Sequence, residues 1–495
     1  MIKNNQTKTL VFYAISFILM ASVMIMPFSK VSAATIITIN TTNVLRQESS
    51  SLKFGWNVPP DNFNFWDDAN WTVKNSIKTY MNEMRGQYYR YPGGTPANYF
   101  YWKGSIGNYG SRSSMYTGYN TWYTPKLGVD EALRFIESVG GEMIYVLKMS
   151  DLSDHTLSAQ DCADLVEYLN GAVGSNPNGG TDWAQKRKDN GHEAPYNIKL
   201  FELGNELDWP QSNYTTTAYT SLSQAIMSAM LNVDNTIKFV GHARSSPWSA
   251  TQWTNDWSNW NNPVMDKLND YPQVIGMAFH PYYSQGGVDY MFNKWISELK
   301  TAMSPRISNG KVYITENAVW SDVVTDATSN MDGAVTTARF LLKSAMDPQI
   351  EMKIWHTFGK YRNNGRWASF ETNDTPRPIT EVFKVLYNHG LRGDIVQSTG
   401  STATIQVIGS KDTGSGGYYR MSASNYEVTD QTLSVTMNGL SSGSKPAVLK
   451  IVKPNGTDYE TEINYTQNIN LTVSTGGLFS VVIPAKSVMV LMIPK

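Results

Sequence analysis

Residues 199–206 read KLFELGNE, a short apolar run that ends in Gly204-Asn205-Glu206. A helical pattern follows at 221–231, and another β-rich run follows at 237–241. A strand, a helix and a second strand in this order form the repeating unit of a parallel sheet with crossover helices. The stretch therefore predicts two parallel strands, with the carboxyl group of Glu206 just beyond the end of the first.

The same alternation extends in both directions, from about residue 52 to residue 390. Eight candidate strands lie at 53–55, 88–91, 143–147, 199–203, 237–241, 274–279, 311–314 and 352–355. Helical patterns between them lie at 129–139, 160–169, 221–231, 289–302, 335–345 and 379–389. Eight strands over roughly 300 residues predict an α/β fold, a closed (β/α)₈ TIM barrel over residues 52–390. The alternative is a doubly wound sheet, but that fold would need an early glycine-rich phosphate turn, which the sequence lacks.

The pattern changes after His389. Helical periodicity stops, and polar, turn-forming residues separate alternating runs such as ATIQVIG at 403–409 and TLSVTMNG at 432–439. These runs predict an antiparallel β-sandwich over residues 391–495. A similar alternating strand lies within residues 34–51, and we expect it to cross over and pair with the sandwich.

The first 33 residues have a composition of their own. Lys3 and Lys8 supply a positive start, residues 10–28 are almost wholly apolar, and residues 31–33 (VSA) have small side chains. This layout is typical of a cleavable secretory signal and predicts a secreted protein with no stable membrane association after cleavage. The alternative is an uncleaved anchor, because the apolar run is nearly long enough to span a bilayer.

The overall composition excludes several classes of function. The chain has 495 residues, 41% hydrophobic and 17% charged, so it can bury a large core. The formal net charge is −1, which argues against a nucleic acid partner. Cys162 is the single cysteine of the sequence, which excludes an internal disulfide and a multi-cysteine zinc site. No motif indicates a metal or an organic cofactor, and we predict none.

A second strand delivers a second glutamate. Residues 311–317 read KVYITEN, which places Glu316 at the C-terminal edge of the seventh strand, as Glu206 follows the fourth. Two carboxyl groups facing one another across a barrel mouth are what cleavage of a glycosidic bond requires. We predict Glu206 as the acid/base and Glu316 as the nucleophile of a retaining glycoside hydrolase. Asn205, directly before the acid, is placed to hydrogen-bond a sugar 2-hydroxyl.

Longer motifs surround both glutamates. They are RYPGG at 90–94, EYLNG at 167–171, DWA at 182–184, NGH at 190–192, PYN at 195–197, GNE at 204–206 and HPYY at 280–283. With these motifs the sequence resembles clan A of the retaining glycoside hydrolases, and within it family 51, the α-L-arabinofuranosidases. The resemblance implies that Arg90 holds the nucleophile and its surroundings, and that His280 and Tyr282 lie beside the nucleophile. It also implies a sugar pocket with Trp355 as its apolar floor and Trp56 and Lys148 in its wall.

The residues expected to line the sugar pocket depart from the family pattern. The first strand, FGWNVP at 54–59, lacks the acidic sugar-binding residue expected there. Thr95 and Lys148 stand where the family usually has asparagine. Lys148, with Lys360, Arg362 and Arg366, raises the hypothesis of an acidic sugar such as a uronate.

These departures leave several substrates open. The first hypothesis is an α-L-arabinofuranosidase that acts on plant-type polysaccharide or oligosaccharide. An endo-β-glycanase, a β-xylosidase or a glucuronidase-like enzyme of the same clan is the alternative. A carbohydrate-binding protein that has lost catalysis is a third, from a different functional class.

Overall fold

The computed structural model describes residues 33–48, 52–61, 64–84, 87–149, 159–209, 214–244, 257–320, 329–359 and 367–495. The helices and strands named below belong to one compact unit, Ala34–Lys495. The predicted signal segment lies outside the described residues apart from Ala33, and so do Lys360, Arg362 and Arg366. Among the described helices, none combines the length and the apolar character needed to cross a membrane.

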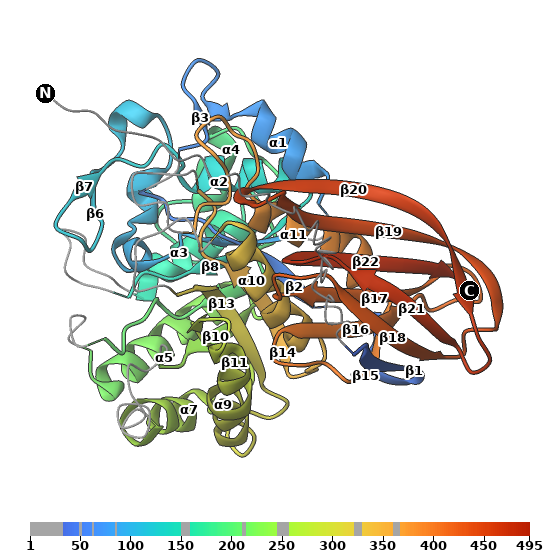
Figure 1. The fold of residues 1–495 in the computed structure, drawn as a ribbon. Helices are drawn as coiled ribbons and strands as arrows, with labels where there is room; N and C mark the ends of the chain where they lie inside the picture. Colours follow the sequence, from blue (N-terminus) through green and yellow to red (C-terminus); the bar gives the residue numbers. More distant parts are fainter. Residues whose placement is uncertain are drawn as a thin grey trace, which may run out of the picture. The chain divides into compact units, whose positions relative to one another are not determined.

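Eight parallel strands close into a barrel (Figure 1). In chain order they are β2 (Lys53–Asn57), β5 (Gln87–Tyr91), β8 (Glu142–Val146), β9 (Leu200–Glu202), β10 (Lys238–His242), β11 (Val274–Ala278), β13 (Lys311–Val319) and β14 (Ile350–Trp355). Each strand pairs with the next, and β14 pairs with β2 to complete the ring. The predicted fold class is therefore confirmed, and each predicted strand overlaps an observed one.

Helices connect the strands and cover the barrel. They are α1 (Asn75–Asn82), α2 (Val129–Ser138), α3 (Ala159–Asn170), α4 (Trp183–Asp189), α5 (Thr216–Val233), α7 (Asn262–Leu268), α8 (Gly287–Tyr290), α9 (Ser297–Met303), α10 (Met331–Ala345) and α11 (Pro378–Val385). Short strands add two hairpins in the loops, β3 (Trp66–Asp67) with β4 (Thr72–Val73), and β6 (Met115–Tyr116) with β7 (Trp122–Tyr123). A further short strand, β12 (Tyr282–Tyr283), pairs with the end of β13.

The alternation of side chains along each strand divides the apolar residues into two cores. Ile144, Val240, Tyr313 and Ile354 come from four different strands yet form one buried cluster, so they meet inside the barrel. The intervening residues point outwards and join the larger core between the strands and the helices. This parity decides which side chains can reach the barrel mouth and which cannot.

The second sheet contains nine strands and is mostly antiparallel. They are β1 (Thr35–Arg46), β15 (Asp394–Thr399), β16 (Ile405–Lys411), β17 (Tyr418–Asn425), β18 (Gln431–Asn438), β19 (Gly443–Asn455), β20 (Asp458–Val473), β21 (Leu478–Ile483) and β22 (Ser487–Pro494). The N-terminal strand β1 lies between β15 and β18, antiparallel to the first and parallel to the second. Figure 1 shows it in blue among the orange and red strands of the C-terminal part. The alternating inward residues of these strands bury a second core.

Polar contacts join the sandwich to the barrel. The buried guanidinium of Arg46, at the end of β1, donates to the backbone carbonyls of Ala345 and Ile350. Arg377, which precedes α11, forms an ion pair of 2.8 Å with Glu460 of β20. These contacts tie the first strand and the last domain to the outer face of the barrel. The exact domain boundaries stay predictions.

Candidate active site

The ends of six barrel strands supply one cluster of polar side chains. Asn57, Arg90, Glu202 and His242 lie at or next to the last residues of β2, β5, β9 and β10. His280 and His356 follow just after β11 and β14. Because parallel strands of a barrel end on the same face, these side chains converge at its C-terminal mouth, where barrel enzymes hold their sites.

A register shift on β13 brings two successive residues into this cluster. Ile314 pairs with Lys353 and Asn317 pairs with Trp355, so β13 has one more residue than β14 over this stretch. Thr315 donates to Glu202 at 2.9 Å, and Glu316 accepts from Arg90 at 2.8 Å. In a regular strand, two neighbouring side chains would point to opposite faces. The extra residue therefore allows both to face the mouth, as bulges beside functional sites commonly do.

Glu316 is buried among donors. Its Oε1 accepts from Arg90 Nη1 at 2.8 Å and from Asn57 Nδ2 at 3.2 Å, and its Oε2 accepts from the Tyr282 hydroxyl at 2.9 Å. Burial alone would raise the pKa of this carboxyl, but the positive charges of His280 and Arg90, together with the hydrogen bond from the Tyr282 hydroxyl, hold the pKa of Glu316 below its usual range. Glu316 is therefore held as a carboxylate.

Arg90 organises the floor of the site. The side chain is fully buried and donates through Nε and Nη2 to the two oxygens of Glu202, at 2.7 and 3.0 Å. Nη2 also donates to Asn205 Oδ1 at 2.8 Å, which leaves the Asn205 amide nitrogen available as a donor. A planar guanidinium that binds one carboxylate through two nitrogens has little freedom to turn.

Glu206 lies on the other wall and is more exposed. Its side chain is 21% exposed, against 4% for Glu316, and its Oε1 lies 2.9 Å from His280 Nδ1. The backbone at Glu206 has φ of 47°, in the left-handed region that non-glycine residues rarely adopt. This turn directs the carboxyl into the mouth straight after β9 has ended.

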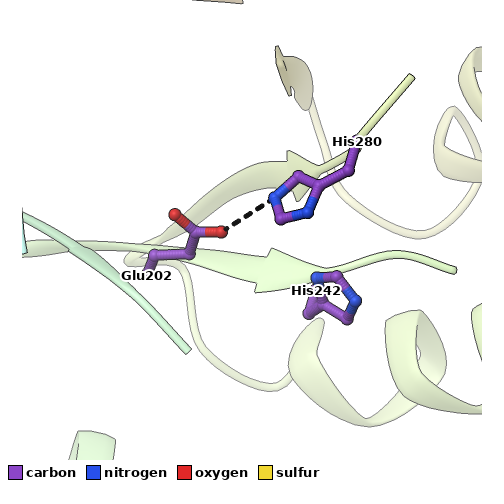
Figure 2. Close-up of side chains that lie close together, drawn as sticks. All are labelled: Glu202, His242 and His280. Carbon is purple, nitrogen blue, oxygen red and sulfur yellow. Dashed lines mark ion pairs between the residues drawn. The ribbon is translucent and has the colours of Figure 1, made fainter. Parts of the chain in front are cut away.

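His280 connects the two walls. Its Nδ1 faces Glu206, and its Nε2 lies 2.9 Å from Thr315 Oγ1 and 3.6 Å from Glu202 Oε1. Figure 2 shows the ion pair between His280 and Glu202, and it also shows His242, at the end of β10. Burial would lower the pKa of His280, but the surrounding charges of Glu316, Glu202 and Glu206 raise it to about 9. The ring is therefore an imidazolium at neutral pH, and both nitrogens donate.

Two groups of these side chains have the spacing of metal ligands. One is Glu202, His242 and His280, and the other is Glu206, His280 and Glu316, each with ligand atoms within 4.8 Å of one another. Both oxygens of Glu202 already accept from the Arg90 guanidinium, a fixed positive charge that would repel a cation. Glu316 of the second group likewise accepts from Arg90, at 2.8 Å. An ion-pair network therefore explains these groups better than a metal site.

A pocket of about 380 Å³ opens above the cluster. It is lined by Gly94, Thr95, Tyr119, Asn205, Glu206, Trp209, His280, Tyr282, Trp295, Glu316, Trp320, His356 and Trp367. Six of these residues are aromatic tyrosines or tryptophans, whose faces suit the apolar faces of sugar rings. Two carboxyl groups at the bottom of an aromatic pocket can perform acid–base and nucleophilic chemistry on a carbohydrate.

Known proteins match the chain at the levels of sequence and fold. Residues 80–278 match the family model of the alpha-L-arabinofuranosidase 1 domain. An exo-α-(1→6)-L-arabinofuranosidase of Bifidobacterium longum is 26% identical over 206 residues, which are 41% of this chain and 36% of that protein. The crystal structure of an α-L-arabinofuranosidase from Thermotoga maritima has a TM-score of 0.75 at 16% identity, over 93% of this chain and 99% of that chain. A family 51 α-L-arabinofuranosidase from Bifidobacterium longum has a TM-score of 0.73 at 17% identity, over 92% and 99%.

The chain resembles glycoside hydrolase family 51 of clan A. The resemblance inferred from the motifs is thereby confirmed. The structural likeness shows the fold, because identity to the solved structures is low. The chain spans 36% of the length of the Bifidobacterium longum exo-enzyme, so activity and substrate belong to the proposal below.

The structure brings most of the predicted site residues together. Asn205, Glu206, His280, Tyr282 and Glu316 all line the pocket. Arg90, also predicted, lies directly beneath it, in contact with the carboxylate of Glu316. The roles of these residues stay part of the proposal.

Trp56 and Trp355 lie elsewhere, contrary to the expected sugar contacts. Both are completely buried in the core between the barrel and the helices, where each packs against Phe383. The reason is the parity of the strands. Asn57 and His356, one residue further along, face the mouth, so Trp56 and Trp355 must face outwards.

Lys148 also lies outside the lining of the pocket. It borders a separate small cavity next to Cys162 and Leu165 of α3. Strand β8 ends at Val146, so the alternation no longer fixes the direction of the side chain at Lys148. Cys162 is buried, and burial raises the pKa of its thiol to about 12, as expected of an unreactive structural cysteine.

Sequence reasoning missed several residues of the site. Asn57, His356, Glu202 and Thr315 were not predicted, although counting alternate residues along the strands would have found the first two. The tryptophans Trp295, Trp320 and Trp367 come from three separate segments after the sixth, seventh and eighth strands. No local pattern in the sequence indicates that these segments meet.

Proposed function

We propose that the chain is a retaining glycoside hydrolase that releases terminal α-L-arabinofuranosyl residues from plant-type polysaccharide. The observation that carries the proposal is the pair of carboxyl groups on opposite walls of one pocket. Oxygens of Glu206 and Glu316 lie within 4.8 Å of each other. Retaining enzymes hold such carboxyl groups about 5 Å apart, whereas inverting enzymes separate them by roughly 6.5–9.5 Å to admit a water molecule.

The surroundings of the two groups support different roles. Glu316 accepts hydrogen bonds at both oxygens and is kept ionised, as a nucleophile must be. Glu206 is bound through one oxygen to His280 and is open to the pocket, so its second oxygen is available for a proton. On the side of Glu206, which is the more exposed carboxyl group, the leaving group can depart and a water molecule can then enter.

The reaction then proceeds in two displacements. In the first, Glu206 gives its proton to the glycosidic oxygen, the bond from that oxygen to the anomeric carbon breaks, and a carboxylate oxygen of Glu316 bonds to the anomeric carbon. In the second, Glu206 takes a proton from water, the water oxygen bonds to the anomeric carbon, and Glu316 leaves as a carboxylate. Inversion occurs twice, so the product retains its configuration.

The neighbours of the two glutamates assist by charge and position. Arg90 and the Tyr282 hydroxyl hold the Glu316 carboxylate in place, which fixes the direction of attack. The Asn205 amide nitrogen is placed to donate to the 2-hydroxyl of the sugar, a contact that strengthens in the transition state. His280 holds Glu206 while the proton passes in each direction.

The nature of the substrate is supported by the comparisons and by the pocket. The matching proteins are named as arabinofuranosidases. A β-xylosidase or an endo-acting glycanase of the same clan is the second candidate, because the neutral Asn57 touches the nucleophile at the end of the first strand, where an acidic residue was expected. The described lining contains no lysine or arginine to receive a uronate.

Secretion is part of the same proposal. The basic start, the apolar run at 10–28 and the small residues at 31–33 support a cleaved signal and an extracellular enzyme with a carbohydrate substrate. N-terminal sequencing of the protein from the culture medium would test it. A mature N-terminus at Ala34 is expected, and a membrane-bound chain that starts at residue 1 would contradict the proposal.

A set of nitrophenyl glycosides tests the reaction and the sugar. We expect hydrolysis of the α-L-arabinofuranoside, with a loss of about 10²–10⁴-fold in kcat for Glu206→Gln and a loss at least as large for Glu316→Gln. Glu137→Gln, on the outer helix α2, is the matched control and should leave activity unchanged. Preference for a xyloside or for polymeric glucan would favour the second candidate.

Azide distinguishes the two roles. Azide should restore turnover of Glu316→Gly and give a glycosyl azide of inverted configuration, because it attacks where the nucleophile has been removed. It should restore turnover of Glu206→Gly with retained configuration, because it replaces water in the second displacement. Full activity of Glu316→Gln, or hydrolysis with net inversion by the unmodified protein, would overturn the proposed mechanism.

A further inference from the structure

His356 stands beside the nucleophile without a role in the two displacements. It follows β14, lines the pocket, and its side chain is 17% exposed. Its Nδ1 lies 2.7 Å from Asn57 Nδ2 and 3.6 Å from Glu316 Oε2. The ring is also held edge-on by Trp367, at a centroid distance of 5.3 Å and an angle of 70°.

The orientation of the Asn57 amide is fixed by two neighbours of opposite character. Arg90 Nη1 donates to Asn57 Oδ1 at 3.0 Å, and arginine can only donate. Asn57 Nδ2 lies 3.2 Å from Glu316 Oε1, and a carboxylate can only accept. Turning the amide over would place two donors together at Arg90 and two acceptors together at Glu316.

The amide in turn fixes the tautomer of His356. Because Asn57 presents its N–H groups to Nδ1 of the ring, that nitrogen must be the acceptor, and the proton of the neutral ring sits on Nε2. A doubly protonated ring would bring two donors to 2.7 Å. Burial lowers the pKa of His356, and the positive charges of Arg90 and His280 lower it further. The carboxyl groups of Glu316 and Glu206 act in the opposite direction but do not outweigh burial.

The second ring nitrogen has no partner within the described part of the chain. No hydrogen bond from His356 Nε2 to a described residue is present, while the ring borders the pocket. An N–H group on the wall of a pocket whose floor is the nucleophile needs an acceptor there. A sugar hydroxyl oxygen supplies one.

We propose that His356 is a specificity-determining residue whose Nε2–H donates to a hydroxyl of the sugar ring that Glu316 attacks. The Arg90–Asn57 pair sets the direction of that donor before the substrate arrives. The inference rests on the proposed function for the identity of the ligand, but the tautomer follows from the side chains alone. A site built to bond one hydroxyl discriminates strongly against a sugar that lacks it.

Nuclear magnetic resonance of the full chain with ¹⁵N-labelled histidine rings tests the tautomer without reference to activity. The His356 signals are assigned by their loss in His356→Gln. We expect a pyridine-type Nδ1 and a pyrrole-type Nε2 at neutral pH. In Asn57→Asp the carboxylate accepts instead, so Nδ1 should become protonated. A protonated Nδ1 in the unmodified protein would overturn the proposal.

Kinetics test the contact with substrate. His356→Phe keeps an aromatic ring but has no donor, and kcat/KM should fall about 10- to 100-fold. His356→Gln keeps an N–H group and should recover part of the loss. The difference between the unmodified protein and His356→Phe should vanish on the one monodeoxy glycoside that lacks the bonded hydroxyl. An equal loss on every deoxy substrate would contradict the proposal.

The two readouts separate the inference from the proposed function. If no nitrophenyl glycoside is cleaved, the function fails, and titration with free L-arabinose and D-xylose is followed on the Nε2–H signal. A shift of that signal in the unmodified protein supports the contact. If a sugar binds to saturation and the Nε2–H signal does not shift, the proposed contact is overturned. It is also overturned if neither sugar binds.

Discussion

Arg90 donates to two carboxylates at once: Nη1 lies 2.8 Å from Glu316 Oε1, and Nε lies 2.7 Å from Glu202 Oε2. All three side chains are almost completely removed from water. One guanidinium on β5 therefore compensates negative charges delivered by β9 and β13. The imidazolium of His280, between Glu202 and Glu206, supplies the second positive charge of the network.

Removing the guanidinium should destabilise the fold as well as the site. In Arg90→Met the carboxylates of Glu202 and Glu316 are left buried without their main partner, which costs about 3–5 kcal/mol in comparable buried pairs. Urea denaturation measures the loss. Arg306→Met removes an exposed ion pair with Asp266 and should cost less than about 1 kcal/mol. Equal effects of the two substitutions would mean that the buried network contributes little.

The contribution of His280 to stability should fall as the pH rises from 6.5 to about 9. The folded-state pKa is raised from 6.5 to about 9, so in this window the folded chain holds a proton that the unfolded chain has released. The contribution is complete below pH 6.5, is on the order of 3 kcal/mol, and is lost above pH 9. In His280→Gln the free energy of unfolding should lose this slope. A slope that is unchanged in the variant would show that other groups cause it.

The alternation of strands and helices was enough to predict the barrel and the strands that carry both glutamates. The alternation did not determine whether an individual side chain points into the barrel or towards the helices. Trp56 and Trp355 were expected in the pocket, whereas Asn57 and His356, one position further on, reach the mouth. An error of one residue in the register assigned to a strand reverses every inside and outside assignment along it.

Other features of the site depend on irregularities that the sequence pattern does not show. The register shift on β13 allows both Thr315 and Glu316 to face the mouth, while a regular strand would have turned one of them away. The tryptophans of the pocket wall come from segments whose meeting depends on tertiary packing. By contrast, GNE at 204–206 was informative because a strand end and a carboxyl group coincide in one short motif.

A buried lysine outside the pocket offers a gain in stability. Lys353 on β14 is completely buried, and its Nζ has no hydrogen-bond partner in the part of the chain that the structure covers. Burial, with the nearby charge of Arg46, holds the pKa of Lys353 well below 10.5. Replacing the amine by the apolar side chain of Lys353→Met should raise the free energy of unfolding by about 1–3 kcal/mol at pH 7.

The pH dependence of this gain checks its cause. Between the lowered folded-state pKa of Lys353 and 10.5, the unfolded chain binds the proton that the folded chain lacks, so the penalty that Lys353 imposes on stability becomes smaller as the pH rises. The advantage of Lys353→Met should therefore shrink towards pH 10. Lys238→Met, at a partly exposed position of β10, should change stability by less than about 0.5 kcal/mol. A gain that is constant with pH would indicate improved packing instead.

The rim of the pocket should control binding more than chemistry. Tyr119 lies in the loop between β6 and β7, is 64% exposed, and donates to Thr95 Oγ1 at 2.7 Å across the pocket edge. Its exposed ring borders the pocket and offers a stacking face to a substrate. In Tyr119→Ala we expect KM for the nitrophenyl α-L-arabinofuranoside to rise about 10-fold with kcat nearly unchanged, since uniform binding is lost. Tyr119→Phe keeps the ring and should recover most of the affinity. Trp122→Ala is the control, because Trp122 is an exposed ring of the same hairpin that does not line the pocket. It should leave KM and kcat unchanged. A fall in kcat with KM unchanged would place Tyr119 in the transition state instead of at the rim.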